Sequence, residues 1–313
     1  MKGPDFIGIG QQKAGTGWLY YQLSNHPDFW LPPVKELHFF DRGFNFRWAL
    51  HRFNNTLKMR QPRGPRNWRR LVESDSGSNK AVLDKLEFDL EFYHHVLVTR
   101  TARVMKRKSS KRPDGGEFAE HVNEKQLKFY ADIFDIADRL SGDITPAYAV
   151  LSPNSIRRIT SEFGDTKYIL QIRHPVSRTI SQIRHYFRNG AIDEQSFANA
   201  DAMRKLLDTY PQFVRNSSSS SIYANWSSEL RKENLLVLAL EEIIAAPDAS
   251  RQKLAEYLAV DNDRFNLPAD SNHKEDYHKV EIPRESVDYL KQYFASEVDL
   301  CHETFGQICA SWE

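Results

Sequence analysis

The sequence predicts an α/β protein in which helices cover both faces of a central parallel sheet. Short apolar runs recur along the chain, and stretches with helical spacing of apolar residues separate them. This is the pattern of parallel strands joined by crossover helices. The runs that we expect to be strands are residues 6–9, 29–31, a short stretch within 139–146, 168–172 and 235–240. Residues 36–40 are also expected to be extended.

Helices are expected where apolar residues recur every three to four positions between end signals such as proline or glycine. The first covers residues 18–23, and another is opened by Pro175 and ended by Asn189-Gly190. The remaining expected helices are 83–97, 127–134, one that starts near Ser152, 248–259 and 283–305. The serine run at 217–221 is either a mobile loop or the start of a helix.

The length of 313 residues fits one large domain that carries an insertion. We therefore expect a single domain over residues 1–313 that carries a less regular, basic insertion at about 42–130. Two segments in this insertion contain no acidic residue: residues 58–70 hold six Lys or Arg, and residues 100–112 hold seven.

Composition excludes several classes of protein. The 43 Lys and Arg balance 42 Asp and Glu, which argues against binding nucleic acid over the whole surface. The two cysteines, Cys301 and Cys309, exclude a disulfide framework and are expected to be apolar side chains in a terminal helix. There is no apolar stretch of membrane-spanning length and no signal peptide, so the expected location is the cytoplasm.

A polar loop between the first strand and the first helix has the composition of a phosphate-binding loop. It runs Gly10-Gln11-Gln12-Lys13-Ala14-Gly15-Thr16-Gly17. Small residues let backbone N–H groups approach an anion, and the helix N-terminus adds unpaired donors. Lys13 supplies a charge and Thr16 a hydroxyl. The alternative is an ordinary tight turn from strand to helix.

The loop departs from the pattern of nucleoside triphosphatases. That pattern places Lys-Ser/Thr directly after the second glycine, but Gly15 is followed by Thr16-Gly17 and the lysine stands earlier, at position 13. The residue that would hold Mg²⁺ is missing. A kinase built on a related phosphate loop is therefore a second hypothesis, and a non-catalytic nucleotide-binding protein is a third.

The stretch QQKAGTGW resembles the 5′-phosphosulfate loop of sulfotransferases that use 3′-phosphoadenosine 5′-phosphosulfate, in the carbohydrate-type and bacterial branch. The resemblance implies a P-loop-like sulfotransferase fold and this nucleotide as co-substrate, with adenosine 3′,5′-bisphosphate as product. It also implies a set of co-substrate-binding residues: Lys13, Ala14, Gly15, Thr16, Gly17 and, as a ring that stacks on adenine, Trp18. A core position on the first helix is the alternative for Trp18.

A second motif of that family is similar to the stretch from Tyr168 to Ser181. Here a buried strand ends in Arg173-His174-Pro175, and Ser181 follows two turns into the next helix. The resemblance implies that Arg173 and Ser181 bind the 3′-phosphate. The placement is physically reasonable, because ligands of α/β sheets bind at the carboxyl ends of strands. Arginine also offers a planar fork of donors to phosphate.

The catalytic assignment rests on Lys35-Glu36-Leu37-His38-Phe39-Phe40, which resembles a segment of the same family. We expect Glu36 to take the proton from the acceptor, with His38 as the second candidate because its ordinary pKa suits a base. Lys13 is expected to neutralise the leaving phosphate. Further on, Gly142-Asp143-Ile144-Thr145-Pro146-Ala147-Tyr148 resembles a Gly-Glu-Lys-Thr-Pro-x-Tyr segment in which this chain lacks the lysine.

The acceptor is expected to carry a hydroxyl group, as a sugar, glycolipid or small alcohol does. The basic segments could form an entrance for an acidic acceptor or glycan, although such runs are more often solvated surface. Phe44, Phe46 and Trp48 could stack on a sugar, and residues 273–279 could close over the co-substrate. No metal site is expected, since ligand-type residues are not clustered.

Overall fold

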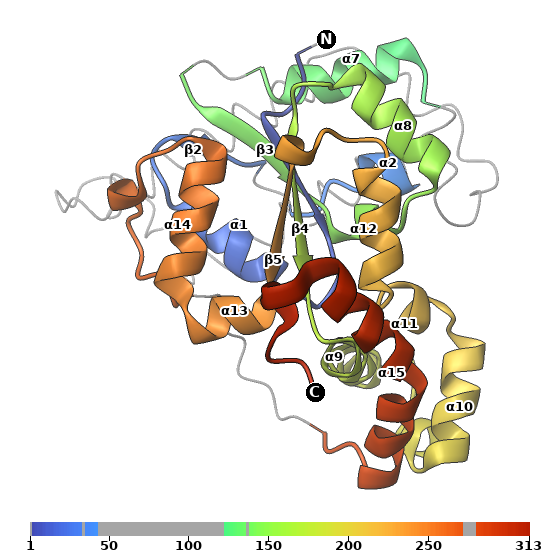
Figure 1. Ribbon diagram of the computed structural model, residues 1–313. Helices are drawn as coiled ribbons and strands as arrows, with labels where there is room; N and C mark the ends of the chain where they lie inside the picture. Colours follow the sequence, from blue (N-terminus) through green and yellow to red (C-terminus); the bar gives the residue numbers. More distant parts are fainter. Residues whose placement is uncertain (1, 33–34, 43–121, 136–137, 272–279) are drawn as a thin grey trace, which may run out of the picture.

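The computed structural model describes residues 2–32, 35–42, 122–135, 138–271 and 280–313 (Figure 1). Most of the predicted basic insertion, including residues 58–70 and 100–112, lies outside the described residues. The predicted helix at 83–97, the aromatic residues Phe44, Phe46 and Trp48, and the closing segment 273–279 also lie outside them.

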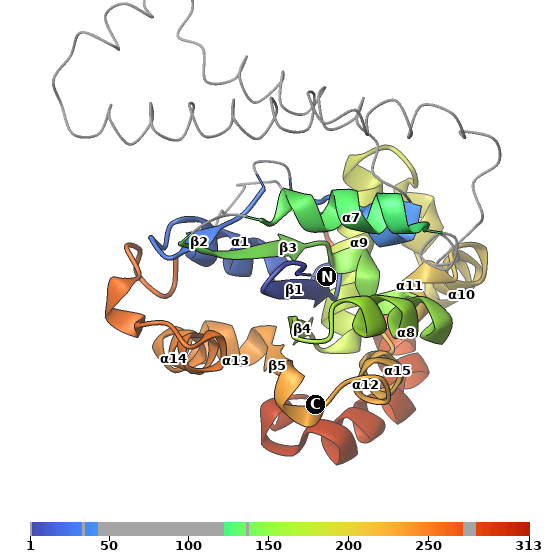
Figure 2. The ribbon, with the colours of Figure 1, turned by 90° about the horizontal axis from the view of Figure 1, so that it is seen from above.

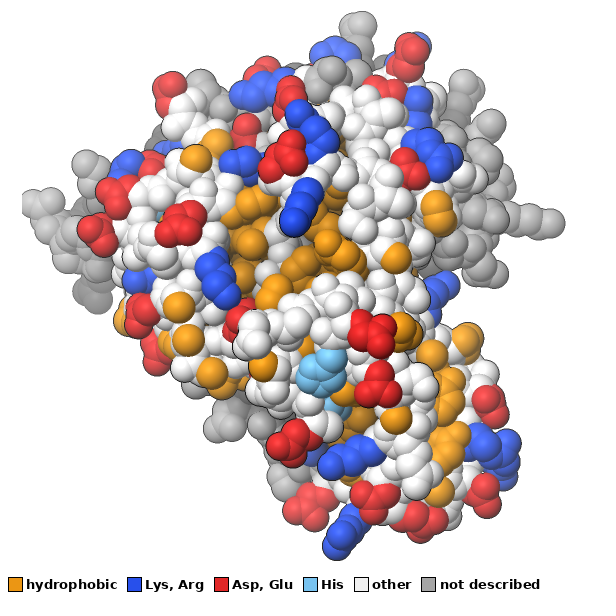
Figure 3. All heavy atoms as spheres, in the orientation of Figure 1, with side chains coloured by type: hydrophobic (Ala, Val, Ile, Leu, Met, Phe, Trp, Pro, Cys, Tyr) orange, Lys and Arg blue, Asp and Glu red, His pale blue; other side chains and the backbone are white. Residues whose placement is uncertain are grey.

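Five parallel strands form the central sheet, as the sequence predicts. Their order across the sheet is β2-β3-β1-β4-β5. The strands are β1 Phe6–Gly10, β2 Phe29–Trp30, β3 Leu140–Ile144, β4 Lys167–Ile172 and β5 Leu235–Ala239. Each lies within a predicted strand region, and all except β3, which reads LSGDI, are mainly apolar, as strands covered on both faces are. Strands β2 and β5 are the two edges of the sheet, and Figure 3 shows hydrophobic side chains gathered where β5 runs.

Helices cover both faces of this sheet. The helices are α1 Thr16–Ser24, α2 Phe39–Arg42, α7 Glu124–Ile133, α8 Pro153–Glu162, α9 Pro175–Arg188, α10 Ala200–Thr209, α11 Gln212–Arg215, α12 Ser219–Ser227, α13 Leu240–Ala245, α14 Pro247–Leu258 and α15 Arg284–Phe305. In Figure 2, α13 and α14 lie on one side of β1, β4 and β5, and α8, α12 and α15 lie on the other.

The alternation of side chains along β4 divides the core into two layers. Tyr168, Leu170 and Ile172 pack in one cluster with residues of α7, α8, α12 and α15. Ile169 packs in the other, with residues of α1, α13 and α14. A third cluster joins α9, α10 and the first half of α15. Successive strand residues face opposite sides of a sheet, so one buried strand anchors both layers of helices.

The expectation that residues 36–40 are extended is wrong in part. Residues 36–38 have no regular structure, and α2 begins at Phe39. Phe39 and Phe40 are both buried in the same aromatic cluster around Tyr130. Neighbouring residues of a strand face opposite sides, whereas a helical turn lets both rings reach one cluster.

The two cysteines are buried free thiols. Cys301 lies in α15, but this helix ends at Phe305, and Cys309 belongs to the short turn Gly306–Cys309. They therefore do not share one helix as expected. The serine run starts α12 at Ser219, which resolves the two alternatives in favour of a helix.

Candidate active site

The two predicted anion-binding motifs lie side by side at the carboxyl ends of β1 and β4, which are neighbours in the sheet. The chain leaves β1 toward β2 on one side and leaves β4 toward β5 on the other, so the two strands flank a topological switch point. The guanidinium of Arg173 donates a hydrogen bond to the carbonyl oxygen of Lys13 over 3.1 Å. The loop after β1 and the residue after β4 thus form one site.

The loop after β1 has a backbone that requires small residues. Gly15 precedes α1 with φ 90°, and a Cβ there would lie 2.7 Å from Leu240 Cδ1. Its carbonyl oxygen accepts a hydrogen bond from Gln171 of β4 at 3.2 Å. No side chain of the described residues caps the start of α1. The N–H of Trp18 donates to the carbonyl oxygen of Gly15, and the N–H groups of Thr16 and Gly17 remain for an anion.

Lys13 has the left-handed backbone conformation, with φ 68°. Outside glycine this conformation costs about 1–3 kcal/mol, and residues that adopt it cluster at functional sites. Burial is the main cause that lowers the pKa of Lys13 to about 8, and Arg188 lowers it further. Close by, the ammonium of Lys35 donates to Thr16 Oγ1 at 3.3 Å. Several cations therefore surround the loop.

Arg178 of α9 is a buried cation that sequence reasoning missed. It has no exposed surface, and its guanidinium donates to Ser217 Oγ, Gln182 Oε1 and the carbonyl oxygens of Phe213 and Gln12. All four acceptors are neutral. A positive charge thus lies directly behind the predicted phosphate loop, and an anion bound in that loop would supply a counter-charge. Its only signal in the sequence is its position five residues after Arg173.

Arg173 itself keeps an unused donor. Its Nε is buried and has no hydrogen-bond partner among the described residues. An unmade hydrogen bond at a buried, charged donor is costly, and a phosphate oxygen would satisfy it. Ser181 lies two turns into α9 and is partly exposed. The free donor of Arg173 fits an anion, whereas no contact of the described residues joins Ser181 to Arg173.

Trp18 lies in the core, which is the alternative that the sequence left open for it. The ring is 2% exposed and packs with the residues of α1 and α14. Its indole N–H donates to the carbonyl oxygen of Ala269 at 2.7 Å. In this structure no face of the ring is open to a base.

Glu36, His38 and Asp41 form a chain of charged side chains. His38 Nε2 lies 3.2 Å from Glu36 Oε2, and His38 Nδ1 lies 2.9 Å from Asp41 Oδ2. Burial opposes protonation of His38, but its hydrogen bonds to Asp41 and Glu36 outweigh this effect and raise its pKa to about 9. Burial likewise opposes ionisation of Glu36, yet His38 and Lys35 hold the pKa of Glu36 below its ordinary value. At neutral pH the site holds a carboxylate beside an imidazolium.

Glu241 and the last residues of the chain support the loop that carries Arg173. Glu241 accepts hydrogen bonds from the backbone N–H of His174 and from the indole N–H of Trp312. The carbonyl oxygen of Glu313 lies 3.0 Å from His174 Nε2. The C-terminal residues therefore pack against the β4–α9 junction.

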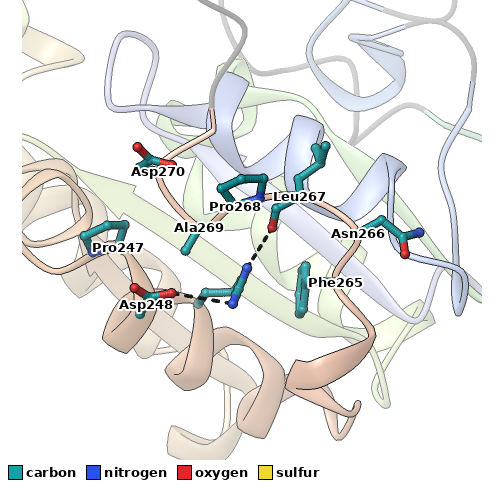
Figure 4. Close-up of a pocket in the computed structure, with 9 residues that line it drawn as sticks. Pro247, Asp248, Phe265, Asn266, Leu267, Pro268, Ala269 and Asp270 are labelled. Atoms are coloured by element: carbon teal, nitrogen blue, oxygen red, sulfur yellow. Dashed lines mark hydrogen bonds and ion pairs between the residues drawn. The ribbon is translucent and has the colours of Figure 1, made fainter.

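A separate cavity of about 590 Å³ lies between the start of α14 and the segment after it (Figure 4). Arg251 crosses it, with a hydrogen bond of 2.8 Å to the carbonyl oxygen of Leu267 and a 3.5 Å ion pair with Asp248. None of the predicted site residues lines this cavity. The residues that do are Pro247, Asp248, Arg251, Phe265, Asn266, Leu267, Pro268, Ala269 and Asp270.

The described residues contain neither a metal-binding cluster nor a membrane-spanning helix. Within them, no group of three or more His, Cys, Asp or Glu is placed to hold a metal ion. None of the helices formed by these residues is sufficiently long and apolar to span a bilayer.

Comparisons with known proteins agree with the motifs. The fold is similar to that of a sulfotransferase from Alicyclobacillus acidocaldarius, at TM-score 0.56 and 19% identity over 96% of this chain and 94% of that chain. Weaker similarity extends to a sulfotransferase domain from the curacin biosynthetic pathway, at TM-score 0.41 and 16% identity over 83% of this chain and 75% of that one. No curated protein matches the chain. The model of the sulfotransferase family matches residues 4–264, and the chain therefore belongs to the sulfotransferase family.

Proposed function

We propose that this sulfotransferase moves the sulfuryl group of 3′-phosphoadenosine 5′-phosphosulfate to an acceptor hydroxyl. The observation that carries the proposal is the contact between Arg173 and the backbone of Lys13. It supports a single cleft with one anion pocket after β1, for the 5′-phosphosulfate, and another after β4, for the 3′-phosphate. The buried, unpartnered Nε of Arg173 supports the second pocket.

In this proposal the phosphate loop binds the group that departs. Backbone N–H groups from Gly15 to Gly17 and the hydroxyl of Thr16 orient the 5′-phosphate, whereas the N–H of Ala14 donates to the carbonyl oxygen of Gln11 within the loop. Lys13 neutralises the charge that grows on the bridging oxygen as the sulfur–oxygen bond breaks. Arg178 adds charge from behind the loop. Arg173 and Ser181 hold the 3′-phosphate and so fix the position of the sulfuryl group.

Glu36 is the base that the electrostatics favour. As the acceptor oxygen attacks sulfur, its proton passes to the Glu36 carboxylate. His38 is already protonated at neutral pH, because its pKa is raised to about 9, and so it cannot accept a second proton. Its role is to hold Glu36 by their 3.2 Å contact. Asp41 orients the far side of the imidazole.

The proposed acceptor is a compound with a hydroxyl group, such as a sugar, a glycolipid or a small alcohol. The positive charges of Lys13, Lys35 and Arg188, which affect one another across the loop, favour an acidic acceptor. Because screening weakens such attraction, the acceptor KM should rise with ionic strength.

Thermal unfolding tests the nucleotide assignment without an acceptor. Adenosine 3′,5′-bisphosphate at a hundred times its Kd should stabilise the folded protein by about 2.7 kcal/mol. ATP with Mg²⁺ should give no comparable protection, whereas a kinase would show the reverse. A screen of hydroxyl compounds with the labelled sulfuryl donor, read as the mass gain of one sulfo group, then identifies the acceptor. Protection without any transfer would favour a non-catalytic binding protein.

A further inference from the structure

The segment that carries Glu36 and His38 is held by two hydroxyl groups from a distant part of the chain. The backbone N–H groups of Leu37 and His38 donate to Thr145 Oγ1 at 3.1 and 3.5 Å. The N–H of Phe39 donates to the hydroxyl of Tyr148 at 2.9 Å. Three consecutive amides are therefore anchored to the residues that follow β3.

Both hydroxyls in turn donate to Asp143, a β3 residue that is 1% exposed. Thr145 Oγ1 lies 2.7 Å from Asp143 Oδ1, and the Tyr148 hydroxyl lies 2.9 Å from Asp143 Oδ2. Tyr130 adds a third hydroxyl at 3.0 Å. An ionised carboxylate only accepts hydrogen bonds, so each hydroxyl must direct its proton to Asp143. The lone pairs of the Thr145 and Tyr148 hydroxyl oxygens are then left to accept the backbone N–H groups of residues 37–39.

The backbone at His38 requires such support. Its φ of 55° lies in the left-handed region, which a residue with a side chain adopts only when its surroundings demand it. A peptide rotation on either side would relieve this strain. It would also break the bonds to Thr145 or Tyr148 and turn the imidazole away from Glu36 and Asp41.

We propose that Asp143, Thr145 and Tyr148 are positioning residues that hold Glu36 and His38 in their catalytic orientation. None of them needs to touch either substrate; they act through the backbone of residues 37–39. The inference rests on the proposed function, because it takes Glu36 and His38 as the proton-handling pair. It also gives a role to the carboxylate and the two hydroxyls of the segment Gly142-Asp143-Ile144-Thr145-Pro146-Ala147-Tyr148, in which the lysine of the similar family segment is absent.

The sharpest test compares the two tyrosines whose hydroxyl groups donate to Asp143. Tyr148→Phe and Tyr130→Phe each remove one buried hydroxyl that donates to Asp143, and each leaves the charge of the site unchanged. Only Tyr148 also accepts the N–H of Phe39. A structural role would give the two variants the same effect. Asp143→Asn is less informative alone, because its lost charge acts directly on His38.

The acceptor-independent readout is the titration of His38, followed by ¹⁵N NMR and assigned with His38→Gln. Wild type should titrate near pH 9. In Tyr148→Phe and Thr145→Val the midpoint should move toward the ordinary value of about 6.5, since Glu36 and Asp41 no longer enclose the ring. Asp143 also acts on His38, Arg42 pairs with Asp41, and Lys35 acts on Glu36; these charges are the same in all the variants. Tyr130→Phe and Thr145→Ser, which keeps the hydroxyl, should resemble wild type.

Turnover and binding give the second readout. With the acceptor from the mass-gain screen, Tyr148→Phe should lower kcat by about tenfold or more while Tyr130→Phe changes it by less than about twofold. Both should bind adenosine 3′,5′-bisphosphate as wild type does. Equal effects of the two variants, or an unmoved His38 titration in Tyr148→Phe, would overturn the inference. Failure of wild type to bind the bisphosphate would instead overturn the proposed function.

Discussion

The guanidinium of Arg173 reaches across from the end of β4 to the carbonyl oxygen of Lys13, 3.1 Å away, in the loop that follows β1. This hydrogen bond joins two segments that are 160 residues apart in sequence. Because one partner of this bond is the backbone of Lys13, the bond fixes the distance between the two proposed anion pockets more firmly than a contact between two flexible side chains would. In the proposed function, the spacing of the two phosphate pockets would therefore be set before the nucleotide binds.

Arg173→Ala should weaken the binding of adenosine 3′,5′-bisphosphate. A hydrogen bond to a charged group contributes about 1.5–3 kcal/mol, so Kd should rise by about 10- to 150-fold. Isothermal titration calorimetry measures this directly. Arg204→Ala is the matched control, because Arg204 lies on α10 and pairs only loosely with Asp201 and Asp208. Wild-type affinity in Arg173→Ala would refute the 3′-phosphate assignment.

Affinity for the bisphosphate should depend on pH through Lys13. The pKa of Lys13 is lowered to about 8, so the free protein loses this charge as pH rises through 8 and affinity should fall there. Binding of an anion favours the charged lysine, and the complex should take up a proton above pH 8. Calorimetry in buffers of different ionisation enthalpy detects that uptake. Lys13→Arg keeps its charge, and a fall as steep in that variant would contradict the role of Lys13.

Glu36→Gln should lose at least about 100-fold in kcat and bind the bisphosphate as before. The pH profile separates the two candidate bases. A base with the pKa of His38, about 9, would make kcat rise steadily from neutral pH toward 9. The Glu36 carboxylate is already ionised at neutral pH, because its pKa is below its ordinary value, so kcat should not rise. A tenfold rise per pH unit would assign the base to His38.

Gly15→Ala should destabilise the protein and weaken bisphosphate binding more than Gly190→Ala does. Both glycines have positive φ, at 90° and 70°, so each alanine bears a backbone cost of about 1–2 kcal/mol. Only at Gly15 would the new Cβ meet a neighbour, Leu240 Cδ1 at 2.7 Å. Thermal melts and calorimetry compare the pair. Equal losses would show that close approach to Leu240 is unimportant.

Elements with local end signals could be predicted from sequence. The helix expected from Pro175 to the residue before Asn189-Gly190 is α9, Pro175–Arg188, because proline and glycine act through their own backbones. The strands β1, β4 and β5 were predictable as apolar runs. Helix α10 was missed although Asn199 caps it and Met203, Leu206 and Leu207 are buried at helical spacing.

Two residues of the predicted site lie where a strand ends: Arg173 directly follows β4, and Lys13 stands in the loop after β1. Their proximity could be predicted, because the carboxyl ends of neighbouring parallel strands meet at one edge of the sheet. Arg178 could not be recognised, because its meaning depends on the packing of α9 against Phe213 and Ser217. The conformation of residues 36–40 depends on Tyr148, which is more than 100 residues away. Long-range hydrogen bonds of this kind leave no local pattern.

The packing of Trp312 and Glu313 against Glu241 and His174 has a practical consequence. Any purification tag or fluorescent fusion joined after Glu313 would enter the polypeptide beside the junction that bears Arg173. Such a fusion to this 313-residue chain would disturb the contact with His174 and so weaken nucleotide binding through the tag itself. Label placement at the other end, which Figure 1 shows far from this junction, keeps the nucleotide measurements interpretable.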